Sequence, residues 1–143
     1  MSRVRPVTEP DALVDTSVAV ALVVADHEFH SRVLESVRGL TLGLAGHAAF
    51  ETYSVLTRMP APIRRPPAVV ADLLRRNFLA SRFLGAAATR RTLQELADLG
   101  VAGGSVYDAL VAATAREHHA TLLTRDVRAI DTYRAFGIAL RVL

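Results

Sequence analysis

Four acidic residues lie beside or within apolar segments of the sequence, where a charged side chain is unusual. Asp15 directly follows the short apolar segment ALV, and Asp126 comes shortly after the apolar segment ATLLT. Glu51 lies among apolar neighbours in AAFETYSVL, and Asp108 lies in GGSVYDALVAAT, in the first turn of an expected helix. Acids at two strand ends and within two otherwise apolar helices form a pattern, so we treat these four residues as a candidate site.

Each acid also has a structural explanation that stays open when the residue is taken singly. Asp126 can cap the helix expected after it, and Asp15 can be an ordinary turn residue. Glu51 can pair with Arg58 two turns further along its helix. Asp108 can simply complement the helix dipole, which favours a negative charge in a first turn by roughly 0.3–1 kcal/mol at an exposed position.

If the four acids converge, their chemistry is restricted. Carboxylates close together repel one another, and burial further disfavours their charged forms. Such a cluster is stable when a hard divalent cation occupies it. Ligation by oxygen alone, in a chain without cysteine, favours Mg²⁺ or Mn²⁺ over zinc. Mg²⁺ held by carboxylates is typical of phosphoryl-transfer and phosphodiester chemistry.

The elements that must position these acids follow from the hydropathy pattern. Short apolar segments alternate with amphipathic ones, which favours an α/β sandwich with a mostly parallel sheet. Ligands bind such sheets outside the carboxyl ends of the strands, where Asp15 and Asp126 are expected. The candidate strands are 12–15, 40–45, 82–86, 120–124 and 138–143. The expected helices are 18–25, 26–39, 47–59, 68–80, 89–100, 101–119 and 126–137, and Thr16 or Ser17 is expected to cap the first.

Size and composition exclude several classes of protein. The 143 residues predict a single domain, 1–143, with a polar lead-in over 1–11. The longest apolar run, 18–25, is too short to span a bilayer, and the start of the chain lacks the apolar core of a secretory signal. We therefore expect a cytoplasmic protein without membrane contact. The absence of cysteine excludes disulfides and thiolate chemistry.

All 17 basic residues are arginine, and the net charge is +3. Arginine suits phosphate recognition, although codon usage in a GC-rich genome also explains the missing lysine. Without lysine, a lysine base or Schiff-base nucleophile is excluded. A phosphatase or receiver-like domain, which also places aspartates at strand ends, is disfavoured because it needs a partner lysine or a second aspartate close to Asp15.

Four segments resemble the PIN-domain family, and more closely the VapC-type toxins of bacterial toxin–antitoxin pairs. They are LVDTSV, FETYSVLTR, GGSVYDALVAATA and ATLLTRD, and their order and spacing match from about residue 12 to the end. The resemblance implies a three-layer α/β/α sandwich with a five-stranded parallel sheet. It also implies a metal-dependent endoribonuclease using Mg²⁺ or Mn²⁺, with Asp15, Glu51, Asp108 and Asp126 as catalytic and metal-binding acids.

The resemblance further implies helper residues and partners. Thr124 and Ser17 are expected to assist the acids through hydrogen bonds or water. RNA is the expected substrate, a small antitoxin protein the expected inhibitor, and a homodimer the expected assembly. Arg125 and Arg128 are candidates for RNA phosphate contacts, since an acidic cleft alone would repel RNA, but solvation or an intramolecular ion pair explains each of them equally well. A catalytically silent RNA-binding or scaffold domain is the alternative.

Overall fold

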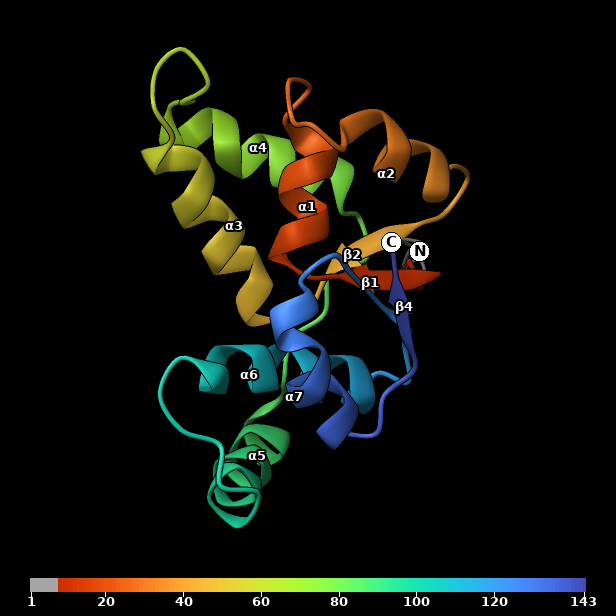
Figure 1. Cartoon of the computed structure of the whole chain (residues 1–143), viewed down its shortest axis with the longest axis vertical. Helices are drawn as coiled ribbons and strands as arrows, with labels where there is room; N and C mark the ends of the chain where they lie inside the picture. Colours follow the sequence, from red (N-terminus) through yellow and green to blue (C-terminus); the bar gives the residue numbers. More distant parts are fainter. Residues whose placement is uncertain (1–7) are drawn as a thin grey trace, which may run out of the picture.

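The protein is a parallel β-sheet covered by helices on both faces, as seen in a computed structural model that describes residues 8–143 (Figure 1). The strands pair in the order β2-β1-β3-β4, and each pairing is parallel. Parallel neighbours need crossover connections, so the intervening helices are carried onto the two faces of the sheet. The strands are β1 (Ala12–Val14), β2 (Leu42–Leu44), β3 (Leu122–Thr124) and β4 (Leu140–Val142).

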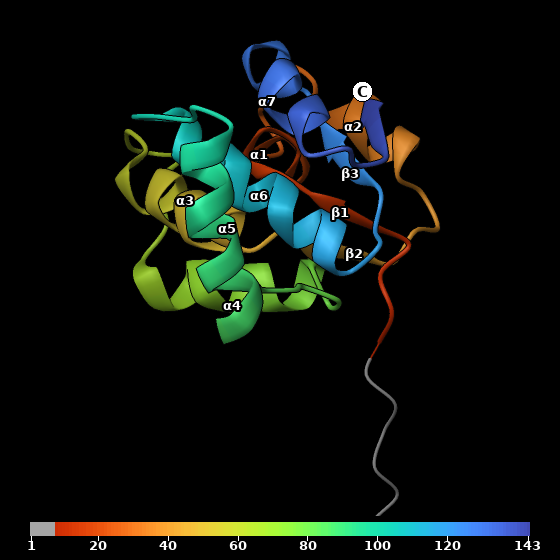
Figure 2. The ribbon, with the colours of Figure 1, turned by 90° about the horizontal axis from the view of Figure 1, so that it is seen from below.

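The helices form the outer two layers. The upper group in Figure 1 is α1 (Thr16–Val23), α2 (His30–Ser36) and α4 (Pro67–Asn77). The lower group is α5 (Ala86–Asp98), α6 (Ser105–Glu117) and α7 (Ile130–Ala135), preceded by the short 3₁₀ helix η1 (Val127–Ala129). Helix α3 (His47–Arg58) contacts α1 and α4 on one side and α6 on the other. Figure 2 agrees with Figure 1 in placing α1 between α4 and α7.

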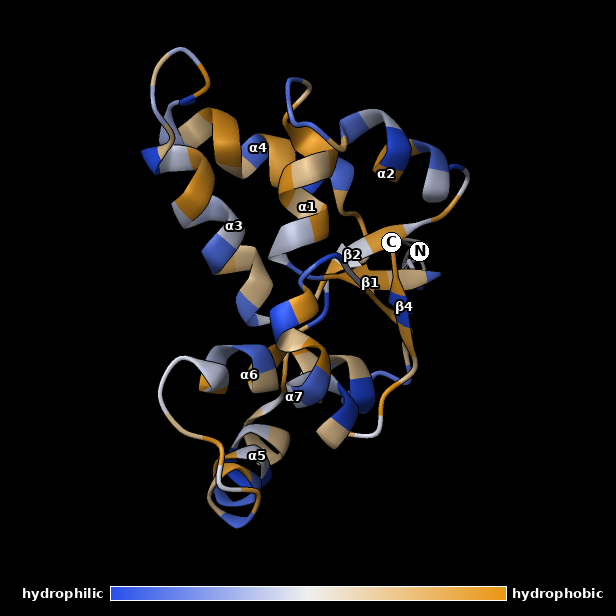
Figure 3. Cartoon of the chain, in the orientation of Figure 1, coloured by the Kyte–Doolittle hydropathy of each residue, from blue (hydrophilic) through white to orange (hydrophobic). Residues whose placement is uncertain are grey.

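Both faces of the sheet are buried, which explains why its strands are apolar at consecutive positions. Ala12 and Val14 pack into the core under α1, α2 and α4, whereas Leu13 packs into the second core against α6 and α7. Leu123 and Leu122 of β3 divide between the two cores in the same way. Figure 3 shows the resulting apolar colouring of the strands and of α1. The expectation of a three-layer α/β fold with a parallel sheet is confirmed.

The prediction of a fifth strand over 82–86 is wrong, because the sheet of the described residues has four strands. Arg82 forms only an isolated bridge with Ala45, and α5 begins directly afterwards at Ala86. The reason lies in the preceding turn. Residues 80–82 do run beside β2, because the N–H groups of Ala80 and Arg82 donate to the carbonyls of Leu42 and Leu44 at 3.1 Å. Between these bonds the N–H of Leu44 donates to the side-chain Oγ of Ser81 at 2.9 Å instead of a backbone carbonyl, so the run of ladder bonds is broken.

The start of α1 also differs from the expectation. Its cap is Asp15, whose side chain accepts a hydrogen bond from the N–H of Val18, whereas Thr16 and Ser17 lie inside the helix. The helix expected over 26–39 is the shorter α2. Of the lead-in expected over 1–11, residues 1–7 lie outside the described part. No helix between residues 8 and 143 combines the length and apolar character needed to cross a bilayer.

Candidate active site

The four predicted acids line one cavity of about 190 Å³. Asp15 directly follows β1 and Asp126 follows β3 after one intervening residue, so adjacent parallel strands deliver both to the same edge of the sheet. Glu51 comes from α3, and Asp108 comes from the first turn of α6. The sheet topology and two helices therefore bring together residues separated by up to about a hundred positions, as the parallel-sheet rule predicts.

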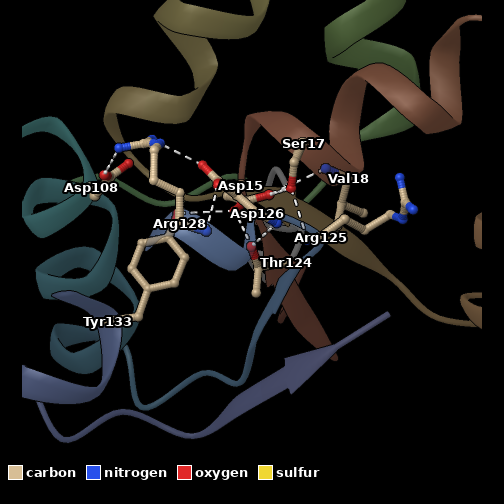
Figure 4. Close-up of polar contacts among 9 residues, drawn as sticks. All are labelled: Asp15, Ser17, Val18, Asp108, Thr124, Arg125, Asp126, Arg128 and Tyr133. Atoms are coloured by element: carbon tan, nitrogen blue, oxygen red, sulfur yellow. Dashed lines mark hydrogen bonds and ion pairs between the residues drawn. The ribbon is translucent and has the colours of Figure 1, made fainter. Parts of the chain in front are cut away.

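Asp15 is the most firmly held of the four acids (Figure 4). Asp15 is 3% exposed, and each of its two carboxylate oxygens accepts two hydrogen bonds. Oδ1 accepts from Ser17 Oγ at 2.5 Å and from the N–H of Val18 at 3.2 Å. Oδ2 accepts from Thr124 Oγ1 at 2.5 Å and from the Tyr133 hydroxyl at 2.9 Å. A carboxylate offers about four acceptor sites, so four donors fix its orientation completely.

Burial sets the protonation tendencies of the site. It raises the pKa of Asp15 above the ordinary aspartate value, and the hydrogen bonds from Ser17, Thr124 and Tyr133 act in the opposite direction. Burial also raises the pKa of Asp108, against the guanidinium of Arg128, which lowers it. The pKa of the Tyr133 hydroxyl is raised, chiefly by burial and then by the negative charge of Asp15. Tyr133 is therefore a donor to Asp15 at every physiological pH.

Arg128 bridges two of the acids. Its Nη1 lies 3.2 Å from Asp108 Oδ2, and its Nη2 lies 3.0 Å from Asp126 Oδ2. This is the intramolecular ion pair considered for Arg128 as an alternative to a phosphate contact. Within residues 8–143, no three His, Asp or Glu side chains stand close enough together to hold one metal ion. The metal-binding roles of the four acids therefore stay predictions.

Both strand-end acids cap a helix, as was considered for Asp126 but not for Asp15. Asp15 caps α1, and Asp126 Oδ1 accepts from the N–H of Arg128 at 3.1 Å, which caps η1. In each acid the cap uses Oδ1, while Oδ2 has other partners, which are Thr124 and Tyr133 for Asp15 and the guanidinium of Arg128 for Asp126. The guanidinium of Arg58, the partner considered for Glu51, donates to Ser54 Oγ at 2.9 Å.

Both expected helpers contact Asp15 and connect it to the loop after β3. Thr124 Oγ1 donates to Asp15 and accepts from the N–H of Asp126 at 3.0 Å, so one hydroxyl joins two of the acids. Ser17 Oγ donates to Asp15 and accepts from the N–H of Arg125 at 2.9 Å. The side chain of Arg125 points away from the acids (Figure 4), and its guanidinium lies 3.6 Å from the ring centroid of Phe29.

The family follows from comparison of the whole chain with known proteins. The family model described as PIN domain matches residues 12–135. The chain belongs to the PIN-domain family. The resemblance seen in the sequence motifs is thereby confirmed at the level of the family.

Named relatives of this PIN-domain chain come from bacteria. It is 45% identical over 130 residues to Ribonuclease VapC27 of Mycobacterium tuberculosis, covering 91% of this chain and 95% of that protein. It is 44% identical over 135 residues to Ribonuclease VapC40 of Mycobacterium tuberculosis, covering 90% and 96%. A chain in the crystal structure of VapBC2 from Rickettsia felis, bound to a DNA fragment from their promoter, superposes with a TM-score of 0.65 at 17% identity. That match covers 92% of this chain and 98% of the other, and it shows the shared fold.

Two residues that line the cavity of this PIN domain were missed by the sequence analysis. Tyr133 lies in an amphipathic helical segment, where an aromatic residue predicts core packing, and only the fold shows that its hydroxyl meets Asp15. Thr16 was considered only as a cap. Its Oγ1 is buried without a hydrogen-bond partner among the described residues.

The residues present fit a hard divalent cation. Carboxylate oxygens and one unpartnered hydroxyl surround the cavity, and oxygen is the donor that Mg²⁺ and Mn²⁺ prefer. Burial raises the pKa of both Asp15 and Asp108, so a cation in the cavity would favour their charged forms. Arg128 supplies part of that charge at the mouth.

Proposed function

We propose that this protein is a metal-dependent endoribonuclease, the toxin component of a toxin–antitoxin pair, which hydrolyses RNA phosphodiester bonds at the cavity lined by the four acids. The observation that carries the proposal is the convergence of Asp15, Glu51, Asp108 and Asp126 on one cavity in a PIN-domain chain. Support comes from two relatives named ribonucleases, each matched over about nine-tenths of this chain.

The proposed cofactor is Mg²⁺ or Mn²⁺. Asp15, Asp108 and Asp126 would hold it, with Glu51 as a direct ligand or a ligand through water. When bound, such a cation would supply a lowered pKa for an attacking water and a positive charge beside the phosphate. As a ligand, Asp15 would exchange one of its four hydrogen-bond donors for the cation, while the remaining donors keep the carboxylate oriented.

The other polar residues have distinct tasks in this proposal. Thr124 and Ser17 orient Asp15 and tie it to the loop that carries Asp126. Arg128 stands at the mouth with most of its side chain exposed, where a guanidinium can exchange a carboxylate for an RNA phosphate. Arg125 is the weaker candidate for such a contact, because its guanidinium is engaged with the ring of Phe29.

Two protein partners are part of the proposal. A cognate antitoxin is implied by the resemblance to VapC-type toxins, and the fold shared with a chain of the VapBC2 structure supports it. A homodimer is the assembly implied by the resemblance to VapC-type toxins. A catalytically silent RNA-binding or scaffold domain remains the alternative, and the presence of all four acids disfavours it because a domain that loses catalysis usually loses such acids.

The decisive experiment measures RNA cleavage directly. Purified protein is incubated with total cellular RNA in Mg²⁺, in Mn²⁺ and in EDTA, and new 5′ ends are mapped by sequencing. We expect defined new ends with either metal and none in EDTA. The Asp15→Asn variant should give none under any condition.

Two results would contradict the proposal. Equal cleavage by the wild type and Asp15→Asn would show that the activity comes from a contaminant or from another site. RNA binding without any new ends in either metal would favour the silent RNA-binding domain.

A further inference from the structure

Helix α3 has two different faces. Its buried face consists of Ala48, Thr52 and Leu56. A second face, at positions that recur every three or four residues, lines an open groove of about 540 Å³ together with Tyr107 of α6. The residues of this second face are His47, Phe50, Glu51, Ser54 and Arg58. We call this surface the α3 groove.

The α3 groove presents aromatic rings to solvent. The rings of His47 and Tyr107 are stacked, with centroids 4.7 Å apart and an interplanar angle of 21°. Tyr107 is 52% exposed and Phe50 is 66% exposed. Exposed rings that are already held by a stacking neighbour provide flat surfaces at little further entropic cost.

The α3 groove is continuous with the candidate active site. Glu51 lines both the groove and the cavity of the four acids, and Tyr107 immediately precedes Asp108. Arg58 lies at the far end of the groove, eleven residues from His47. This separation corresponds to about 16 Å along a helix, which is enough for a short run of nucleotides.

We propose that the α3 groove binds the bases of a single-stranded RNA segment adjoining the phosphodiester bond that is cleaved. This inference rests on the proposed function and adds the place where substrate bases bind. Tyr107 and Phe50 would stack on bases, and Arg58 would contact a phosphate, which is the combination typical of single-strand recognition.

The composition of the groove favours RNA over a second copy of the chain. His47, Glu51, Ser54 and Arg58 make it more polar and charged than the centre of a protein interface, which is depleted in charged residues. The shared Glu51 also places any occupant directly beside the four acids.

The test measures RNA binding without cleavage. A fluorescein-labelled, mixed-sequence single-stranded RNA of about 12 nucleotides, within the range of common single-strand site sizes, is titrated in EDTA with four proteins. They are the wild type, Tyr107→Ala, Tyr107→Phe and Leu93→Ala. Leu93 lies on α5 and is 71% exposed, so its truncation controls for loss of exposed apolar surface away from the groove.

We expect Tyr107→Ala to weaken binding by about fivefold or more, the loss that corresponds to one stacked base. Tyr107→Phe retains the ring and should bind like the wild type, as should Leu93→Ala. Phe50→Ala provides an independent second variant with the same expected direction. Matching circular dichroism melting curves show that the variants are folded.

Two outcomes would overturn the inference. One is equal RNA affinity for the wild type, Tyr107→Ala and Phe50→Ala. The other is a change of molecular mass for these variants in sedimentation, with RNA affinity per folded chain unchanged, which would assign the groove to a second copy. Cleavage of cellular RNA in Mg²⁺ is measured separately. If the protein cleaves RNA but Tyr107→Ala binds RNA as tightly as the wild type, only the inference about the α3 groove is refuted. A protein that binds through Tyr107 but never cleaves refutes the proposed function alone.

Discussion

The Tyr133 hydroxyl donates a hydrogen bond of 2.9 Å to Oδ2 of Asp15, across 118 positions of the chain. Tyr133 is 2% exposed and Asp15 is 3% exposed, so this bond joins α7 to the end of β1 in the interior. It makes the last helix part of the candidate site. It also means that the orientation of Asp15 depends on the packing of α7 and not only on the sheet.

Removing this hydroxyl tests its contribution to the fold. Tyr133→Phe keeps the buried ring and leaves Asp15 with three donors. We expect the free energy of unfolding to fall by about 1 kcal/mol, the typical net contribution of an intramolecular hydrogen bond, somewhat more for a charged acceptor. Urea unfolding in EDTA measures it.

Tyr53→Phe is the matched control, because the ring of Tyr53 is 38% exposed on α3. This control should leave the free energy of unfolding within about 0.5 kcal/mol of the wild type, as is usual for surface changes. Equal stability of Tyr133→Phe and Tyr53→Phe would show that the buried hydrogen bond contributes nothing.

The raised pKa of Asp15 predicts a defined pH dependence of stability. A carboxyl group whose folded-state pKa lies above its ordinary value of 3.8 stabilises the fold fully below that value. This stabilisation is lost as the pH rises through the folded-state pKa, because the folded protein then binds more protons than the unfolded chain. Asp15→Asn cannot titrate and lacks this loss.

We therefore expect the wild type to lose stability relative to Asp15→Asn as the pH rises from about 4, by up to about 1.4 kcal/mol per pH unit within the window. At neutral pH in EDTA the variant should be at least as stable as the wild type. Urea unfolding of both proteins across the pH range measures the difference, in which the titration of Asp108 cancels. If Asp15→Asn melts well below the wild type at neutral pH, the four hydrogen bonds outweigh the burial of the charge.

Arg128 occupies the position between Asp108 and Asp126 that the proposal assigns to a cation. Removing its charge should tighten Mn²⁺ binding, because Mn²⁺ then no longer has to break the ion pairs of Arg128 with Asp108 and Asp126. We expect Arg128→Ala to lower the Kd for Mn²⁺ by about threefold or more, since exposed ion pairs contribute roughly 0.2–1 kcal/mol each. Titration calorimetry provides the measurement.

Arg134→Ala removes the same charge from an exposed position on α7 and controls for the overall field of the protein. An identical effect of both variants would show that Arg128 acts only through net charge. Weaker Mn²⁺ binding in Arg128→Ala would mean that Arg128 supports the metal site instead of competing for it.

Gly43 of β2 lets the backbone of Ala80 lie so close that a side chain at position 43 would clash with it. A Cβ atom there would lie 2.0 Å from the carbonyl oxygen of Ala80, which belongs to the segment that caps the edge of the sheet. We expect Gly43→Ala to lower the free energy of unfolding by about 1–3 kcal/mol, the usual effect of overpacking. Gly104→Ala is the control, since a Cβ at Gly104 meets nothing within 4 Å and the backbone there has φ −61°. Comparable urea midpoints for both variants would contradict the close approach.

The sequence by itself determined the alternation of apolar strands and amphipathic helices and the positions of the four acids. This was possible because both features are local. Buried parallel strands require apolar residues at consecutive positions, and Asp15 follows such a strand directly while Asp126 follows one after a single residue. The rule that ligands bind at the carboxyl ends of parallel strands then brought the two acids together without knowledge of the packing.

The tertiary structure alone decided which side chains meet Asp15 and where the sheet ends. Tyr133 reaches Asp15 because α7 packs beside β1, and no local pattern encodes a contact across 118 positions. Thr124 was expected to assist the acids only from the family resemblance, and the pairing of β3 with β1 makes it a donor to Asp15. The segment 82–86 was predicted as a strand from its apolar residues. It pairs with the edge of the sheet only at Arg82, because the Ser81 hydroxyl replaces one ladder carbonyl and α5 begins at Ala86. Which side chains meet and which backbone segments pair depends on how the helices and strands pack together, and a local sequence pattern does not encode that packing.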